Sequence, residues 1–316
     1  MKKVVLIPII IGSALLVIGG TMFAIGVANN NQSGKIINTT KDIDGTFENI
    51  DIDFDTTDLN IVLADNGKAQ AVFQEREKEY HTVKVEENTL KLSFVNEIKW
   101  YERLFTFNIK PLKCTLYLPT ATYSNLKIKS STGDTTISKE FTFNNVDFKC
   151  STGNLRFNAN VVEELKVNAS TGDIYLNDMS SKSANITVST GNVNLNKVAV
   201  NEKLFVKTST GKIKTTDVTS KDLETNTSTG DVTLTNTIAA NHIEMKASTG
   251  DIKFVDSDAE TLNVKTSTGN VSGTILTSKV FVAISHTGKI HVPETTTGGL
   301  CRIETDTGDI NIKLTA

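Results

Sequence analysis

Residues 226–254 read NTSTGDVTLTNTIAANHIEMKASTGDIKF and contain the tetrad Ser-Thr-Gly-Asp twice, with the two glycines 20 residues apart. The same or a closely similar tetrad recurs from residue 130 to the end of the chain, always at a spacing of 19 or 20 residues. A fixed period of this length is the signature of a repeat architecture. The glycines that share this slot are Gly133, Gly153, Gly172, Gly191, Gly211, Gly230, Gly250, Gly269, Gly288 and Gly308.

Apolar residues alternate with polar ones on both sides of each glycine. Around Gly172, for example, Leu165 and Val167 precede the glycine and Ile174 and Leu176 follow it. A period of two on each side indicates two strands that flank a corner. One such pair cannot bury its apolar edge alone, but stacking successive coils at about 4.8 Å creates a continuous core. The sequence therefore predicts an all-β parallel β-solenoid of about ten coils, with the variation in coil length on a third side.

The corner tetrad has a structural explanation in backbone geometry. A tight corner commonly needs a positive φ, which glycine reaches without steric cost, and the flanking Ser, Thr, Asp and Asn side chains can bond neighbouring backbone groups. The position after the glycine could instead bind Ca²⁺ between coils, because oxygen ligands recur there about 5 Å apart. Interleaved Asn and Lys favour the structural interpretation, so we expect no metal site. The residues of this row are Asp134, Asn154, Asp173, Asn192, Lys212, Asp231, Asp251, Asn270, Lys289 and Asp309.

The region before the regular repeats resembles a divergent start of the same solenoid. Residues 50–61 fit the repeat template with Thr57 in the glycine slot. A terminal cap is expected there, since an uncovered solenoid end exposes strand edges. The segment 96–108, which contains Trp100, interrupts the strand pattern and is either part of that cap, the interpretation we favour, or a binding loop.

An uncharged, mostly apolar run from Val4 to Ala28 follows Lys2 and Lys3. As a helix it would be roughly 37 Å long, enough for a bilayer core of about 30 Å. The preceding positive charge predicts a cytoplasmic N-terminus, a single-pass anchor in the cell membrane and an extracellular solenoid. A signal peptide is the alternative, and it exports the folded part equally. The expected organisation is a cytoplasmic tip (1–3), a transmembrane anchor or uncleaved signal-like segment (4–28), a linker (29–40), divergent N-terminal coils and cap (41–120), and regular β-solenoid repeats (121–316).

Composition and spacing argue against catalysis, cofactors and nucleic acid. The net charge of −3 and the balanced numbers of acidic and basic residues give no basic patch for nucleic acid. Cys114, Cys150 and Cys301 are far apart and show no metal-binding or disulfide pattern, so we interpret them as packing residues. The near-constant coil length leaves no inserted loops to build a catalytic cleft, and the four histidines fit surface or corner positions. We therefore expect no enzyme, no catalytic residue and no cofactor.

Lysines recur four positions before several corner glycines, where the side chains should point outward. The row consists of Lys129, Lys149, Lys207, Lys246 and Lys265. It is a candidate ligand-binding row for phosphate-rich wall polymers. The alternative is a solvated face that also discourages edge-to-edge association.

The passage Leu116-Tyr117-Leu118-Pro119, leading through Tyr123 into Leu126-Lys127-Ile128 and the Ser-Thr-Gly-Asp coils, adds a further indication. Together with the N-terminal span and the degenerate first coil, it resembles a bacterial family of β-strand-repeat envelope proteins, a domain of unknown function labelled "putative adhesin". The resemblance covers nearly the whole exported region. It implies a surface or envelope role, linked in some relatives to antimicrobial-peptide stress responses, and it transfers no ligand residues.

These observations lead to a hypothesis of non-enzymatic binding at the cell surface. Long flat repeat faces suit many weak contacts rather than one deep pocket. The expected partners are the membrane, through the N-terminal segment, and cell-wall polymers, peptides or another membrane protein. The alternative is a membrane-coupled module that senses or regulates envelope stress.

Overall fold

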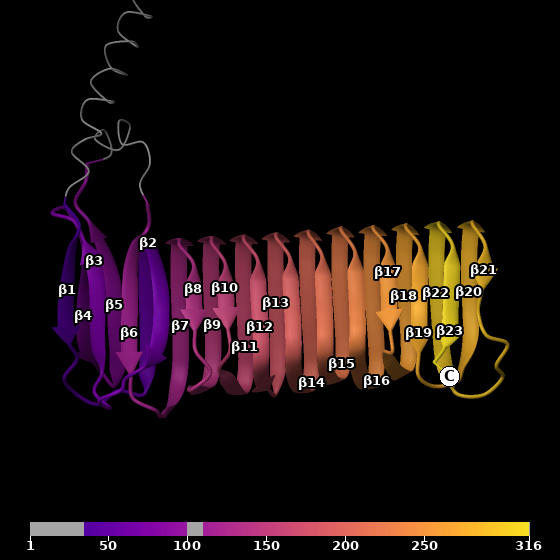
Figure 1. Cartoon of the computed structure of the whole chain (residues 1–316), viewed down its shortest axis with the longest axis horizontal. Coiled ribbons are helices and arrows are strands. Elements are labelled where there is room, and N and C mark those ends of the chain that lie inside the picture. Colours follow the sequence, from indigo (N-terminus) through magenta and orange to yellow (C-terminus); the bar gives the residue numbers. More distant parts are fainter. Residues whose placement is uncertain (1–34, 100–109, 316) are drawn as a thin grey trace, which may run out of the picture.

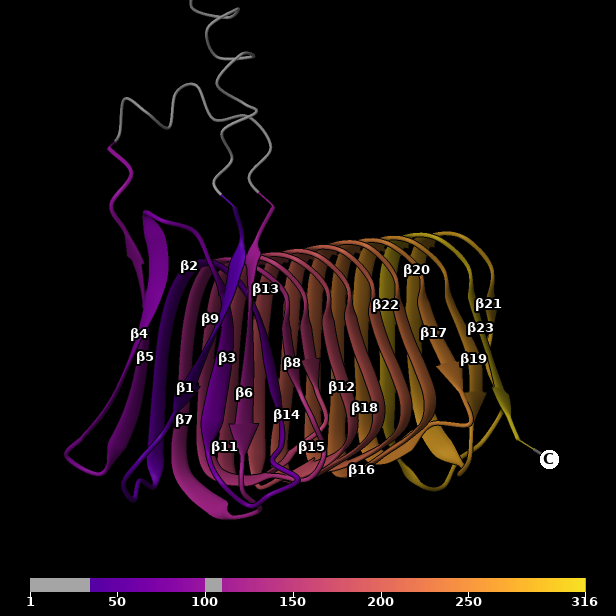
Figure 2. The same ribbon diagram turned by 60° about the vertical axis from the view of Figure 1, so that its left-hand side comes forward.

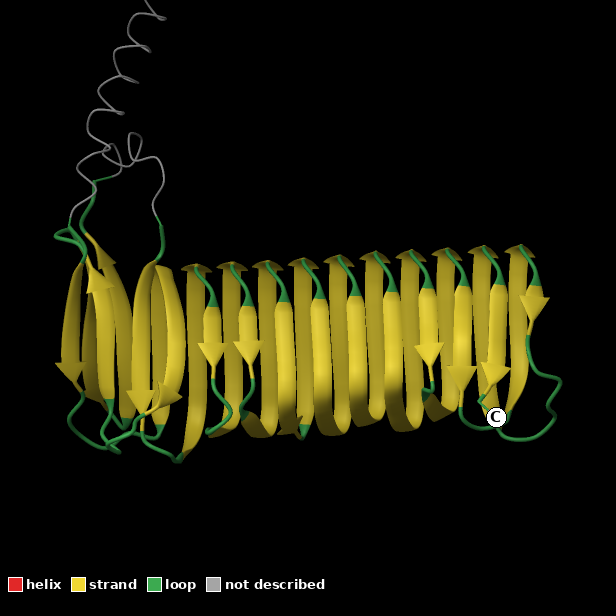
Figure 3. Ribbon diagram, viewed as in Figure 1, coloured by secondary structure: helices red, strands yellow, loops and turns green. Residues whose placement is uncertain are grey.

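The computed structural model describes residues 35–99 and 110–315, whose 23 strands form one continuous sheet wound into a solenoid (Figures 1 and 3). The all-β parallel β-solenoid predicted from the period is confirmed. The expected anchor at residues 4–28 lies outside the described residues. Over the two described stretches, the structure has no helix long and apolar enough to cross a membrane.

Each coil has a long face, a short face and a third side that returns the chain to the long face (Figure 2). Strands that lie mainly on the long face, some of which begin on the third side, are β7 (Thr122–Thr132), β9 (Thr142–Thr152), β11 (Asn160–Thr171), β13 (Ser183–Thr190), β18 (Asp258–Thr268), β20 (Lys279–Thr287) and β22 (Gly299–Thr307). Those that begin on the short face and stay there are β8 (Thr135–Ile137), β10 (Leu155–Phe157), β17 (Ile252–Val255), β19 (Val271–Ile275), β21 (Ile290–His291) and β23 (Ile310–Leu314). Strands that continue around more than one side are β2 (Asn49–Leu63), β12 (Ile174–Ser181), β14 (Val193–Thr210), β15 (Ile213–Thr229) and β16 (Val232–Thr249).

The alternating apolar residues face a single core that runs the length of the stack. Leu165, Val167, Ile174 and Leu176 of one coil are all fully buried, and the equivalent residues of the other coils join the same cluster. Parallel pairing keeps each position in register with its counterpart in the next coil, as between β14 and β15. The three cysteines are buried and free, and Cys150 and Cys301 occupy the packing positions predicted for them.

A second corner, which the sequence analysis did not predict, separates the short face from the third side. It lies six residues after the glycine, where non-glycine residues adopt φ between 46° and 53°. The residues at this corner are Asp178, Lys197, Asp217, Asn236 and Asp256. Where β14, β15 and β16 pair, the register shifts only at the end of the third side, for example between Val200 and Lys203. The 19- and 20-residue coils therefore differ at that side, where packing constrains the chain least.

Among the described residues, the N-terminal region contains one continuous coil, and two further strands stack on it in parallel, one on each face. That coil is β2, which pairs in parallel with β7 on the long face and with β8 on the short face. On its other side β2 pairs in parallel with β5 on the long face and with β6 on the short face, and antiparallel strands complete the cap. The cap strands are β1 (Ile37–Asp42), β3 (Gln70–Glu75), β4 (Glu79–Glu86), β5 (Thr89–Asn96) and β6 (Leu112–Leu118). β1 begins inside the segment expected to be a linker, because it pairs with β3.

The C-terminal coils do not stack in the order of the sequence. The last coil in the chain, β22–β23, lies between β18–β19 and β20–β21, so that β20–β21 forms the end of the solenoid (Figure 1, right). The Ser285 hydroxyl donates to the Gly308 carbonyl at 2.9 Å, and the Thr305 hydroxyl donates to the Gly269 carbonyl at 3.0 Å. The assumption that each coil stacks on its predecessor is therefore wrong for the last two coils.

A buried ion pair bridges the inserted coil. Lys279 Nζ, in β20, lies 2.8 Å from Asp258 Oδ1, in β18, although β22 runs between the two strands. Gly299 of β22 is paired with Lys279 and has no side chain to block this contact. A Cβ at Gly299 would lie 1.7 Å from the Glu260 carbonyl oxygen, so only glycine fits there.

Candidate binding site on the long face

The corner glycines satisfy two independent steric requirements. All ten have φ between 139° and 159°, a conformation that L-residues rarely adopt. A Cβ on Gly153 would also lie 2.1 Å from the Gly133 carbonyl oxygen of the preceding coil, and the other coils repeat this contact. Thr57 can occupy the same slot because no complete coil precedes β2, and its hydroxyl instead lies 3.0 Å from His81 Nε2. The ten glycines therefore have a structural role at the corner.

The residue after each glycine forms a hydrogen-bonded ladder along the solenoid. A side-chain oxygen of one coil accepts the backbone N–H of the corresponding residue in the next coil at 2.7–3.1 Å. The acceptors in stacking order are Asp58, Asp134, Asn154, Asp173, Asn192, Asp231, Asp251, Asn270 and Asp309. Because these oxygens already bind amides, the geometry favours the structural interpretation of the row. Across residues 35–99 and 110–315, no cluster of His, Cys, Asp or Glu could hold a metal ion.

The structure places the five lysines in one outward column of the long face, but it also supplies most of them with carboxylates. Lys129 lies 3.3 Å from Asp53, Lys149 lies 2.9 Å from Asp147, and Lys265 lies 3.0 Å from Glu304. Lys246 lies 2.5 Å from Glu244. Lys207 alone makes no ion pair with the described residues. The positive charge of the column is therefore largely compensated locally.

Two of these partners could have been found in the sequence. Asp53 and Glu304 lie four positions before the corner residues Thr57 and Gly308, so they belong to the same column as the lysines. The column therefore contains acidic residues as well as lysines, and a search for recurring lysines alone does not reveal them. Glu244 and Asp147 belong to the neighbouring column, two residues earlier on the same strands as their lysines.

A shallow hydroxyl-rich groove runs beside the column near the corner. It has a volume of about 400 Å³, and its lining includes Lys129 and Lys149. The remaining lining includes the serines and short polar residues Ser131, Ser151, Asn168, Ser170, Thr187 and Ser189. Because successive coils are in register, hydroxyl groups repeat along this groove at the strand spacing of about 4.8 Å.

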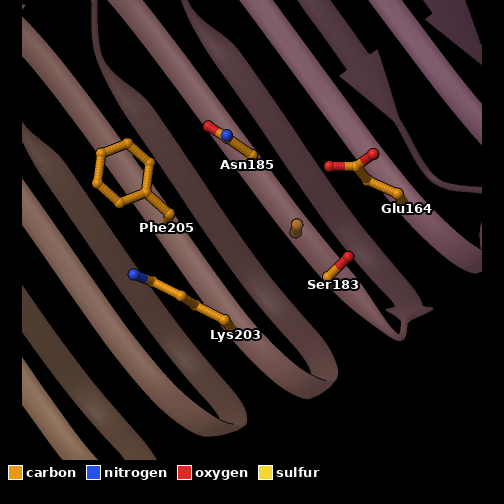
Figure 4. Close-up of a pocket in the computed structure, with 6 residues that line it drawn as sticks. Glu164, Ser183, Asn185, Lys203 and Phe205 are labelled. Carbon is orange, nitrogen blue, oxygen red and sulfur yellow. The ribbon is translucent and has the colours of Figure 1, made fainter.

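A second hollow, of about 320 Å³, lies farther along the same face and has a mixed lining (Figure 4). Ser183 and Asn185 of β13 form its floor, with Glu164 of β11 on one side and Lys203 and Phe205 of β14 on the other. The hollow exists because the outward residues of β13 are short. The inward neighbour Ala184 also occupies a position that Leu165 and Leu204 fill in the adjacent coils.

Phe205 is the feature of this hollow that offers most to a ligand. It is a half-buried aromatic ring in an outward column whose other members, apart from Val282, are polar, and Lys203 Nζ lies over the ring, 5.8 Å from its centroid. Lys203 also forms an ion pair of 2.7 Å with Glu224, which holds its ammonium group away from Glu164. An aromatic ring, an amide, a hydroxyl and a carboxylate thus line one shallow depression. The sequence analysis did not identify this site, although Phe205 was visible as an aromatic residue two positions before Lys207.

The histidines lie in different parts of the fold. His81 is fully buried in the cap, contrary to the expected surface or corner position, and stacks on Phe73 with ring centroids 4.6 Å apart. Burial, with Lys41 adding to it and Glu75 opposing it, lowers the pKa of the His81 imidazole to about 4. His286 is exposed at a corner, 3.2 Å from Asp306, whereas His242 bonds to Thr261.

The chain belongs to the family described as Toastrack DUF4097, whose model matches residues 47–204 and 199–316. This confirms the family resemblance inferred from the sequence. No curated protein matches the sequence.

Several solved bacterial structures are similar over most of their length. One from Parabacteroides distasonis, described as a "putative lipid binding protein", has 15% identity and a TM-score of 0.50 and covers 89% of this chain and 98% of its own. A structure from Bacteroides fragilis described as "putative adhesin" has 17% identity and a TM-score of 0.45 and covers 89% of this chain and 98% of its own. Another described in the same way, from Parabacteroides merdae, has 12% identity and a TM-score of 0.46 and covers 90% of this chain and 98% of its own. At these identities the likeness to the first structure shows a shared fold alone.

Proposed function

We propose that the chain is a non-enzymatic bacterial envelope protein that binds an extended, hydroxyl-rich polymer along its long face. The observation that carries the proposal is the Phe205 hollow, which places an aromatic ring, an amide and a carboxylate on the same flat sheet as the hydroxyl groove. Sugar rings have an apolar face that can stack on an aromatic side chain and hydroxyl groups that bond amides and carboxylates. Several weak contacts along one face add up for a polymer.

The charge distribution favours a neutral glycan over a polyanion. Four of the five column lysines already pair with carboxylates, so a phosphate polymer would have to compete with them. The flanking Asp53 and Glu304 would also repel it. The names of the structural neighbours, "putative adhesin" and "putative lipid binding protein", agree with binding at a surface. The expected N-terminal anchor would hold the solenoid outside the cell membrane, close to wall polysaccharide.

The test is retention of the full chain, in mild detergent, on insoluble wall polysaccharide stripped of phosphate polymers and on the phosphate polymer alone. We expect retention on the neutral glycan that persists at physiological salt. Phe205→Ala should weaken retention about tenfold, the equivalent of about 1.4 kcal/mol of lost stacking and desolvation. Tyr175→Ala is the matched control, because Tyr175 is an aromatic residue on the short face, and it should leave retention unchanged.

The lysine column provides the competing outcome. A different result would identify the lysine column, and not the hollow, as the site. The chain would then bind the phosphate polymer, and this binding would be lost with added salt and when the five lysines are replaced by glutamine. No retention on either polymer would contradict surface binding and would support the membrane-coupled regulatory alternative.

A further inference from the structure

The C-terminal end of the solenoid differs from the rest in its free strand edge. β20 pairs with β22 on one side, and on its other side no strand among the described residues follows (Figures 1 and 3). Its outer N–H and C=O groups are therefore available to a further strand. An exposed edge of this kind is a template for pairing with another chain.

Three successive outward side chains on the long face of this last coil are apolar. Val280, Val282 and Ile284 point outward and are 39%, 40% and 39% exposed. In the columns that these residues continue, the adjacent positions of β22 are Leu300, Arg302 and Glu304, and those of β18, one coil further, are Thr261, Asn263 and Lys265. Terminal repeats normally carry a polar outer surface, since nothing covers them. The reversed pattern indicates that something does cover this one.

The inward side chains of β20 give the same indication. Phe281 and Ala283 continue the core columns but are only partly buried, so the end of the core is open at this point. The cap at the opposite end shows the contrast. Its outer long-face strand, β4, exposes Lys84 and Glu86. Charges on an edge strand discourage pairing with other chains, and β20 has none among its outward residues from Val280 to Ile284.

A further coil in the same orientation would form one corner hydrogen bond fewer at this end. In the corner ladder, Asp309 accepts the backbone N–H of Lys289 at 2.8 Å, but the lysine side chain has no oxygen to offer to a following coil. Continuation of the solenoid by parallel stacking would therefore lack this hydrogen bond, as it already does after Lys212, where β16 still stacks on β15. An antiparallel strand needs no such corner.

We propose that the free edge of β20 binds the β20 edge of a second copy of this chain, in an antiparallel pair related by a two-fold axis at Ala283. In that register Val282 lies opposite Ile284 of the second copy, Phe281 opposite Ser285, and Val280 opposite His286. No two charged groups of like sign face each other, and the outward apolar residues of both copies form one patch. The contact is self-complementary and closed, as in most symmetric dimers, and it covers the open end of both cores.

Disulfide cross-linking of the full chain in the membranes of expressing cells tests the proposal. Ala283→Cys brings two thiols directly opposite each other, at a separation suited to a disulfide. Mild oxidation should convert the chain to a covalent dimer. The three natural cysteines are buried and should not compete. Thr287→Cys is the matched control on the same strand. The two-fold axis at Ala283 separates the two cysteines of this variant by eight residues along the strand, roughly 26 Å, so no disulfide-linked dimer should form.

Adding Val282→Lys and Ile284→Lys to Ala283→Cys should abolish the dimer, since four ammonium groups would be brought together in an apolar contact. The thermal unfolding midpoint of each variant, measured in parallel, shows whether the solenoid remains folded. Absence of a dimer from a folded Ala283→Cys chain, or equal dimer from the Thr287→Cys control, would overturn the proposal. The readout is independent of polymer binding, so this proposal and the proposed function can fail separately.

Discussion

At the scale of the residue, the corner glycines are the most constrained positions in the chain. Gly211→Ala would place a Cβ 2.0 Å from the Gly191 carbonyl oxygen at a φ of 148°. Because that oxygen belongs to backbone on the preceding coil, relief requires the coils to separate, and we expect a loss of stability on the order of 3 kcal/mol. Gly67→Ala is the control, since nothing lies within 4 Å of its Cβ position and only the positive φ costs energy, about 1 kcal/mol. Urea denaturation of both variants measures the difference, and equal losses would contradict the carbonyl contact.

The corner ladder makes a smaller contribution at each step. Asn192 accepts the Lys212 backbone N–H at 2.9 Å and donates to Asp173 Oδ1 at 3.1 Å. Asn192→Ala should therefore cost about 1 kcal/mol, the usual contribution of a hydrogen bond, because the Lys212 amide loses its partner. Asn194→Ala, two residues later on the outer surface of the short face, should cost less than half of that. The denaturation midpoints of the two variants measure this difference. An Asn192→Ala chain as stable as the unmodified chain would show that water replaces the lost hydrogen bond.

The sequence revealed the first corner and not the second for a chemical reason. Glycine is the one residue that fits the first corner, so its column is nearly invariant in the repeat. The second corner needs only a φ near 50°, which Asp, Asn and Lys can all adopt at modest cost, so no single residue type marks it. The Phe205 hollow was missed for a related reason, since it breaks the repeat once and a search for recurrence overlooks single exceptions.

At the scale of the element, the cap depends on a buried histidine that must stay neutral. His81 lies between Phe73 and Phe54, and Glu75 and Lys41 are the charged groups that face it. Its pKa falls from about 6.5 when unfolded to about 4 when folded, so the unfolded chain binds more protons between these values. Cap stability is therefore complete above pH 6.5 and decreases as the pH falls toward 4, by about 3 kcal/mol in total.

Hydrogen exchange can measure this loss locally. Amides of β3 and β4 should lose protection between pH 7 and pH 4 after correction for intrinsic exchange rates, whereas those of β15 should change much less. His81→Phe removes the titration and keeps an aromatic ring, although it leaves the Thr57 hydroxyl unpaired. This variant should be less stable at pH 7 and yet show a flatter pH dependence. An unchanged slope would mean that another group is responsible.

The buried pair of Lys279 and Asp258 fixes how the last elements pack. Both side chains are nearly inaccessible, at 3% and 8% exposure, and the Thr277 hydroxyl donates to Asp258 at 2.6 Å. Lys279→Met should cost 3–5 kcal/mol, roughly, because it leaves a buried carboxylate without its cation. Replacing both residues, with Lys279→Met and Asp258→Leu, should recover most of the loss. In a double-mutant cycle of the same design, the exposed pair of Lys182 and Glu163 should contribute less than about 1 kcal/mol to the free energy of unfolding. A coupling energy for this exposed pair as large as that of the buried pair would contradict the assigned role of burial.

At the scale of the whole molecule, the period predicts that coils stack but not the order in which they do so. Every coil presents the same columns to both neighbours, so β22–β23 fits on either side of β20–β21 as far as the repeat is concerned. The preference comes from features outside the repeat, namely the bridge from Lys279 and the glycine pair at 298–299 that leaves room for it. The cap was expected, but the antiparallel pairing of its strands escaped prediction in the same way, since these strands follow no period.

Engineered disulfides distinguish the two possible coil orders directly. The threonines before the corner form one column, in which Thr268 pairs with Thr307 and Thr307 pairs with Thr287. Thr268→Cys with Thr307→Cys should therefore form an intramolecular disulfide, because adjacent strands are about 4.8 Å apart. Thr268→Cys with Thr287→Cys should not, since an intervening strand doubles that separation beyond the reach of the bond. Sequential stacking would give the opposite result for these two pairs, so the mass of the oxidised chains establishes which coil ends the solenoid and hence which edge is free.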